Sequence, residues 1–333
     1  MSGFDSLLIP AVLFFALGVF AQLIKSDLKF PEGMAKGISL YLLMAIGLKG
    51  GAELAKADLG IAFQAIFWAF LMGLIIPLIG YALLRFRDRI DPFNAAAITA
   101  HYGSVSAATF LTAIAFLETS GIAHESYPII MMVIMESPAI IVGLVLAMLA
   151  RKKLAESKPA VAGQEPDGVD TGSLLKEAFT NGSVILLMGA MVVGALASPD
   201  AMAKVYPFSN EIFMGVLCLF LLDMGMEAAK RIKSFKSAGV TLVSFGIIMP
   251  LIGGTIGVFV GVTLLGFGPG GAMLVAILGS SASYIAVPPA MRYGVPEANP
   301  SFYLTLTLGV TFPFNVVIGI PMFYQMAIWY SGL

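Results

Sequence analysis

Long apolar runs separated by short polar stretches dominate the chain. Several runs reach the roughly 20 residues that a helix needs to cross a hydrocarbon layer about 30 Å thick, and they carry almost no charge. Gly, Pro and clusters of charged residues mark their ends. We therefore expect about ten transmembrane helices. They are predicted at residues 6–24, 34–52, 59–84, 94–117, 127–150, 181–198, 211–229, 237–265, 271–290 and 302–331.

The composition agrees with an all-α polytopic membrane protein. Hydrophobic residues make up 59% of the 333 residues and charged residues 12%, about half of the ~25% charged content of a soluble domain. Cys218 is the single cysteine, which excludes an internal disulfide and a cysteine-based metal site. The Lys and Arg residues flank the apolar runs and form no single basic face, so nucleic acid is not an expected partner.

The distribution of basic residues predicts the orientation. If both termini lie outside, all Lys and Arg residues except Lys49, Lys56 and Lys204 fall on the cytoplasmic side, as the positive-inside rule requires. Residues 151–171 are polar, with prolines and acidic residues after an RKK cluster, and are typical of a linker. This linker is expected in the cytoplasm.

The two sides of the linker resemble each other in order. The pairs are LGVFA (17–21) with VGALA (193–197), AIGLKGGAEL (45–54) with DMGMEAAKRI (223–232), IPLIG (76–80) with MPLIG (249–253), GSVSA (103–107) with GSSAS (279–283), Tyr127 with Tyr303, and Pro138 with Pro313. Five helices per repeat is an odd number, so the second repeat enters from the opposite side, as in many secondary transporters. We predict a 5+5 inverted-topology repeat, with residues 1–150 as the first repeat, 151–175 as the linker and 176–333 as the second repeat.

The fourth and ninth helices are expected to be broken. The runs HYGSVSAAT (101–109) and GSSASYIAVPP (279–289) place Gly, Ser and a Pro-Pro pair deep in apolar sequence. In a bilayer the freed backbone groups need partners in protein, water or ligand, and the positive end of a broken helix suits an anion. The alternative is that small residues only allow close helix packing. Their occurrence at equivalent positions of both repeats favours a binding site.

Neither run contains Lys or Arg, so a bound anion would need a co-bound cation, and sodium fits because it prefers oxygen ligands. Glu136, in MESPA, is the best intramembrane candidate; the alternative is a structural hydrogen bond between helices. Its equivalent stretch, TFPFN, offers Thr311 and Asn315. Asp223 and Glu227 are interpreted as partners of the basic cluster that follows them. The chain has no HExxH or phosphate loop, and we can place no Ser-His-Asp set together, which argues against an enzyme.

These motifs resemble a known family along nearly the whole chain. The chain resembles the SbtA-type sodium-dependent bicarbonate transporters of cyanobacteria and related bacterial permeases. The likeness is carried by LLMAIGLKGG (42–51), GSVSAATFLTAIAFLE (103–118), MESPA (135–139), LDMGMEAAKRI (222–232) and PPAMRYGVPEANPSFY (288–303).

The resemblance implies secondary active uptake of bicarbonate, driven by sodium, in the bacterial inner membrane. It also implies a homotrimer, an elevator-like motion of a core against a scaffold, and regulation by a small PII-like protein on the cytoplasmic face. Bicarbonate and sodium are expected where the two broken helices meet. The expected substrate-binding residues are Gly103, Ser104, Ser106, Thr109, Gly279, Ser280, Ser281 and Ser283. The expected sodium ligands are Glu136, Ser106, Ser283 and Asn315.

Two departures from the family pattern keep other functions open. The cyanobacterial pattern SSSD is SASY here, with Tyr284 in place of the acid, and the acid of the fifth helix is Glu136 instead of Asp. A second hypothesis is therefore sodium-coupled import of another small anion, such as an organic carboxylate. A third, from another class, is a membrane sensor or membrane enzyme that binds its ligand without translocating it.

Overall fold

The protein is described by a computed structural model that covers residues 10–31, 33–56, 58–86, 90–156, 182–232 and 235–332. Every regular element in these ranges is a helix, and labels with η mark π-helical turns. The first six are α1 (Pro10–Leu23), α2 (Met34–Leu54), α3 (Leu59–Arg85), α4 (Pro92–Gly103), α5 (Ala107–Thr119) and α6 (Tyr127–Glu156). The others are α8 (Gly182–Leu196), α9 (Pro199–Tyr206), η3 (Pro207–Glu211), α10 (Phe213–Ile232), α11 (Phe235–Phe259), η4 (Val260–Leu264), α12 (Pro269–Ser280), α13 (Val287–Gly294), α14 (Pro300–Leu304), η5 (Thr305–Thr311), α15 (Phe312–Phe314), η6 (Asn315–Gly319) and α16 (Ile320–Ser331).

Seven helical segments in the described part of the chain are long and apolar enough to cross a membrane. They are Met34–Leu54, Leu59–Arg85, Pro92–Thr119, Tyr127–Leu154, Pro199–Lys230, Gly239–Leu264 and Pro300–Ser331. Three shorter apolar helices are Pro10–Leu23, Ile185–Leu196 and Pro269–Ser280. The prediction of an all-α, multi-pass membrane protein is confirmed, while the count of ten transmembrane helices and the inverted repeat stay predictions.

Part of the predicted domain boundary lies outside the described residues. Helix α6 continues to Glu156, six residues past the predicted end of the first repeat at 150. The rest of the predicted linker, residues 157–175, and the start of the second repeat at 176–181 are not among the described residues. The same holds for five basic residues of the orientation argument, namely Arg87, Arg89, Lys158, Lys176 and Lys233.

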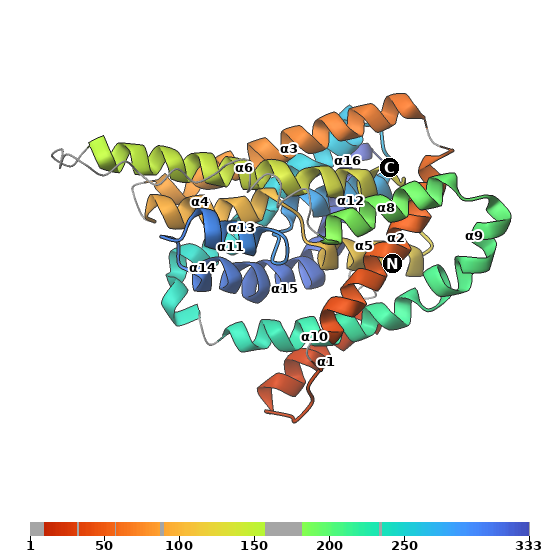
Figure 1. The fold of residues 1–333 in the computed structure, drawn as a ribbon, viewed down its shortest axis with the longest axis horizontal. Coiled ribbons are helices and arrows are strands. Elements are labelled where there is room, and N and C mark those ends of the chain that lie inside the picture. Colours follow the sequence, from red (N-terminus) through yellow and green to blue (C-terminus); the bar gives the residue numbers. More distant parts are fainter. Residues whose placement is uncertain are drawn as a thin grey trace.

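The helices form two groups. Helix α1 packs along α10 and α2 packs along α8, and we call these four helices the frame. Helices α3 to α6 and the elements from α11 to α16 pack mainly on one another, and we call them the bundle. Figure 1 shows α3 and α6 along one side of the molecule and α1 with α10 on the other. Within the bundle, α4, α5 and α12 are almost entirely buried, so the two predicted helix breaks lie in the interior.

The frame helices approach each other through glycines. A Cβ added at Gly18 of α1 would lie 2.0 Å from the carbonyl oxygen of Leu222 in α10, and one added at Gly194 of α8 would lie 2.2 Å from that of Leu48 in α2. Distances this short leave no room for a side chain. Small residues that allow backbones to touch are typical of helix contacts in membranes.

Replacement of Gly194 by Ala should therefore destabilise the protein. Overpacking of a close contact costs about 1–3 kcal/mol, which outweighs the gain of about 1 kcal/mol that Ala brings to a helix. Gly189, on the same helix, has nothing within 4 Å of an added Cβ. We expect Gly194→Ala to lower the unfolding temperature of the purified protein and Gly189→Ala to leave it equal or higher. Equal behaviour of the two variants would contradict the close contact.

An ion pair joins the end of α6 to the connection between α13 and α14. The Arg151 guanidinium donates to both carboxylate oxygens of Glu297 at 2.7 Å and to the Gly294 carbonyl at 2.9 Å, and it lies 5.9 Å from the centroid of the Phe93 ring. This bidentate geometry is the strong form of an arginine–carboxylate contact. The hydrogen bonds from Arg151 hold the pKa of the Glu297 carboxyl below its ordinary value of 4.5.

The lowered pKa of Glu297 predicts a pH-dependent contribution to stability. A carboxyl whose pKa is lower in the folded state stabilises the protein above its unfolded pKa, and the effect disappears as pH falls through the folded pKa. Because Glu297 is partly exposed, the contribution should be about 0.2–1 kcal/mol. We expect Glu297→Gln to lower the unfolding temperature at pH 7 and this difference to shrink between pH 5 and pH 3. Glu211→Gln, at an exposed position, serves as the control and should show no such trend.

Candidate solute-binding site

The first predicted break lies between α4 and α5. Helix α4 ends at Gly103, and Ser104 and Ser106 have extended backbone conformations. The Ser106 hydroxyl oxygen accepts hydrogen bonds from the backbone N–H of Thr109 at 3.2 Å and from the Thr109 hydroxyl at 2.9 Å. Serine in this position caps the new helix by satisfying one of its free N–H groups. A helix N-terminus therefore begins inside the membrane-spanning segment.

The second predicted break lies between α12 and α13. Helix α12 ends at Ser280, Ser281 is extended (φ −84°, ψ 166°), and α13 begins at Val287. The Pro-Pro pair follows directly, in the first turn of α13. Proline is tolerated there because the first N–H groups of a helix have no partner within it. Both interruptions that the sequence predicts are present.

The two breaks contact each other through hydrogen bonds of the backbone. The Ser106 N–H donates to the Ser281 hydroxyl oxygen at 3.0 Å, and the Ser283 N–H donates to the His101 carbonyl at 2.8 Å. Each break thus supplies partners for the backbone groups that the other one frees. All four residues are buried, as irregular backbone at membrane depth requires.

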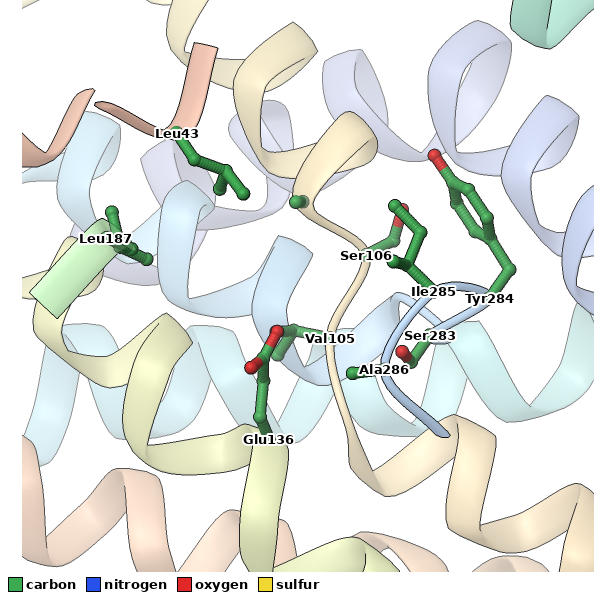
Figure 2. Close-up of a pocket in the computed structure, with 10 residues that line it drawn as sticks. Leu43, Val105, Ser106, Glu136, Leu187, Ser283, Tyr284, Ile285 and Ala286 are labelled. Atoms are coloured by element: carbon green, nitrogen blue, oxygen red, sulfur yellow. The ribbon is translucent and has the colours of Figure 1, made fainter. Parts of the chain in front are cut away.

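A small cavity lies where the breaks meet. Its volume is about 20 Å³, a little more than the minimum for one water molecule. The bundle supplies all its polar side chains, and the frame supplies only Leu43 from α2 and Leu187 from α8 (Figure 2). The remaining residues that line it are Val105, Ser106, Ala107, Glu136, Ser283, Tyr284, Ile285 and Ala286.

Glu136 is the acidic residue of the cavity. It rises from α6 toward the segment that contains Val105 (Figure 2). Among the described residues, no hydrogen bond or ion pair to its carboxylate is found. A carboxylate inside a membrane span is costly unless something neutralises it. A bound cation or a proton would supply that neutralisation.

A comparison with protein families identifies the chain's relatives. A family model described as the Na⁺-dependent bicarbonate transporter superfamily matches residues 10–328. The chain belongs to this superfamily. A search of curated proteins found no match. Membership of the superfamily makes the protein a transporter and not an enzyme, and it supports a small anion as the substrate and sodium as the coupling ion.

In this member of the bicarbonate transporter superfamily, three of the predicted site residues lie at the cavity. Ser106, Ser283 and Glu136 line it. Ser281 and Thr109 lie behind Ser106, and both contact it through hydrogen bonds. Hydrogen bonds thus join Ser106 to Ser281 and Thr109, while Ser283 and Glu136 share only the lining of the cavity with Ser106.

The other predicted residues surround this group without lining the cavity. Ser104 is buried, and its hydroxyl has no partner among the described residues. The Ser280 hydroxyl donates to the Ile277 carbonyl of its own helix at 3.3 Å. The Asn315 amide donates to the Ser280 carbonyl at 2.9 Å, while its oxygen has no partner in the described part of the chain.

Gly103 and Gly279 act in packing. A Cβ added at Gly103 would lie 2.5 Å from the Pro77 ring, and one added at Gly279 would lie 2.3 Å from the carbonyl oxygen of Gly253. Helix α3 and helix α11 therefore approach the two breaks at the points where α4 and α12 end. The sequence placed both glycines at the site, and the structure shows the close contacts that require them.

Leu43 and Leu187 could not be predicted to line the cavity, because nothing in the sequence distinguishes them from the other leucines in apolar runs. A chain of hydrogen bonds behind the first break also has no signal in the sequence. The Tyr102 hydroxyl contacts the Thr311 hydroxyl at 2.6 Å, and Thr311 donates to the Gly246 carbonyl at 2.8 Å. This chain joins α4 to η5 and α11. The sequence predicts Thr311 only as the repeat counterpart of the Glu136 region.

Removal of the Ser281 hydroxyl should loosen the contact between the breaks. Ser281→Ala leaves the buried N–H of Ser106 without its acceptor, at a cost of about 1–3 kcal/mol. Ser280→Ala is the control, because its hydroxyl contacts only a carbonyl that already accepts a backbone N–H. We expect a clearly lower unfolding temperature for Ser281→Ala than for Ser280→Ala, measured on the purified protein. The reverse order would show that the hydrogen bond between the breaks contributes little.

Proposed function

We propose that the protein is a sodium–bicarbonate symporter that binds both ions at the cavity between the two helix breaks. The observation that carries this proposal is the combination of helix N-termini, hydroxyl groups and one carboxylate without a described partner in a single cavity. An anion and a cation bound together avoid much of the cost of moving a single charge through a low-dielectric layer.

The anion is proposed to bind at the start of α5 and α13. Ala107, at the first position of α5, and Ala286, just before α13, line the cavity together with the hydroxyl-bearing Ser106 and Ser283. Backbone N–H groups and the positive end of a helix stabilise an anion. Ser104, Thr109, Ser280 and Ser281 would then support the shape of this site from behind.

Sodium is proposed to bind beside Glu136, with further oxygen ligands from Ser106 and Ser283. Asn315 supports the site through the carbonyl of Ser280. At a one-to-one ratio the transport is electroneutral, and each tenfold sodium gradient supplies about 1.4 kcal/mol. The cavity is smaller than the four heavy atoms of bicarbonate require, so it must widen before the anion binds.

The arrangement of frame and bundle supports an elevator-like motion. All polar groups of the cavity belong to the bundle, and the frame contributes two leucines. A bundle that slides along this apolar surface would carry the whole site with it, and no polar contact at the cavity would need to break. The leucines would act as the wall that separates the site from one side of the membrane.

The glycine contacts of the frame support the inverted repeat. Gly18 and Gly194 are equivalent in the predicted repeat, and each touches the second helix of the opposite repeat, at Leu222 and Leu48 respectively. This exchange is expected of two repeats related by a two-fold axis. A homotrimer, a location in the bacterial inner membrane and a PII-like cytoplasmic regulator remain predictions from the family resemblance. The orientation with both termini outside remains a prediction from the basic residues.

A second candidate function is import of another small anion, such as an organic carboxylate. Tyr284 favours it, since this side chain lines the cavity at the position where the cyanobacterial pattern has an acid. Competition by unlabelled organic carboxylates in a bicarbonate uptake assay separates the two substrates. A sensor would instead bind the anion without any flux.

Uptake of radiolabelled bicarbonate into proteoliposomes tests the proposal. We expect uptake that depends on an inward sodium gradient and that falls at least tenfold, about 1.4 kcal/mol, in Ser106→Ala and Glu136→Gln. Ser137→Ala is the matched control, because Ser137 adjoins Glu136 but lines a separate apolar groove. Bicarbonate uptake that is unchanged by removal of sodium would refute symport.

A further inference from the structure

Polar side chains join the frame to the bundle at the carboxyl-terminal end of α2. The Lys49 ammonium group of α2 forms an ion pair with the Glu118 carboxylate near the end of α5. One turn further along α2, the Glu53 carboxylate accepts a hydrogen bond from the hydroxyl of Ser126, which directly precedes α6. We call these four residues the α2 cluster. All side-chain hydrogen bonds found between described residues of the frame and of the bundle lie in this cluster.

The ion pair of the α2 cluster is partly buried. The exposed fraction of the side chain is 35% for Lys49 and 28% for Glu118, so salt screens their attraction less than at an open surface. Next to Lys49, the backbone of α2 packs directly on α6. A Cβ added at Gly50 would lie 3.4 Å from the Ile129 Cβ. The ion pair and this close contact hold the same turn of α2 against the bundle.

Helix α2 also reaches the cavity. Leu43 lines it, and the distance from Leu43 to Lys49 along the helix is about 9 Å at a rise of 1.5 Å per residue. At the cavity the frame presents apolar side chains, which have no hydrogen bonds to lose when the bundle slides past them. At the α2 cluster, the same motion must separate an ammonium group from a carboxylate and a hydroxyl from another.

We propose that the α2 cluster is a latch, which holds the bundle against the frame in the conformation described here and opens when the bundle moves. This inference rests on the elevator-like motion of the proposed function. Contacts that exist in only one of two conformations shift the equilibrium toward that conformation by their free energy. Because both pairs are partly exposed, water can solvate the separated groups, which keeps the latch weak enough to open.

Disulfide formation between α2 and α6 tests the latch. Cys218→Ala removes the single cysteine of the chain, and Gly50→Cys with Ile129→Cys then introduces two thiols. Their Cβ separation of 3.4 Å is close to the roughly 3.5–4.5 Å of a disulfide. The purified protein is exposed to copper phenanthroline, and the remaining free thiols are counted with a maleimide over time. The half-time of crosslinking becomes longer when the latched conformation is less populated.

We expect Lys49→Met and Glu118→Gln, each in this two-cysteine background, to lengthen the half-time about threefold, which corresponds to about 0.7 kcal/mol. The two substitutions change the charge near the thiols in opposite directions. A local effect on thiol reactivity would therefore slow one variant and accelerate the other, whereas loss of the latch slows both. The double variant should be no slower than either single variant, because both remove the same contact.

Lys56→Met is the matched control. Lys56 is exposed just beyond the same end of α2, and no ion pair with a described residue is found for it. The half-time should equal that of the two-cysteine background. A background protein that forms no crosslink would rule out the packing on which the latch depends.

Unchanged half-times in both Lys49→Met and Glu118→Gln, or opposite changes in the two, would overturn this inference. Crosslinking is measured without any solute gradient, so its result is independent of bicarbonate uptake. If the half-times stay unchanged while the wild type shows sodium-dependent uptake, only the latch falls. If the wild type takes up no bicarbonate and both half-times lengthen, the proposed function falls and the latch stands.

Discussion

The structure depends on backbone groups that have no helical partner inside a membrane. Each helix break frees N–H and C=O groups in a region where water is scarce, and an unsatisfied group there costs several kcal/mol. Each break supplies a hydrogen-bond partner to the other. The Ser106 N–H donates to the Ser281 hydroxyl, and the Ser283 N–H donates to the His101 carbonyl. Each broken helix is therefore stabilised by the other.

The hydrogen bonds between the breaks also shape the candidate site. Because part of the irregular backbone is used for holding the breaks together, the remaining groups at the start of α5 and α13 face the cavity. Glu136 enters from α6 and brings the charge that hydroxyl groups cannot supply. The close contacts of Gly103 with Pro77 and of Gly279 with Gly253 fix α4 and α12 against α3 and α11, so the positions of the breaks are set by packing as well as by hydrogen bonds.

The surface between frame and bundle is apolar at the cavity. Buried polar groups there would need hydrogen-bond partners, whereas apolar side chains need none. The cavity meets the frame through Leu43 and Leu187.

The sequence by itself determined the all-helical, multi-pass class, both helix breaks and the presence of an acid, Glu136, within a membrane span. Each of these features depends on residues close together in the chain. The class follows from the length of the apolar runs, the breaks follow from Gly, Ser and Pro within such runs, and Glu136 is an acid in a segment where burying a charge is unfavourable. Tertiary structure alone decided which oxygens share a cavity. Ser106, Ser283 and Glu136 do, whereas Asn315 contacts the backbone behind it. It also decided that Leu43 and Leu187 line the cavity. Contacts between residues far apart in the chain depend on how helices pack, and one apolar helix face resembles another in sequence.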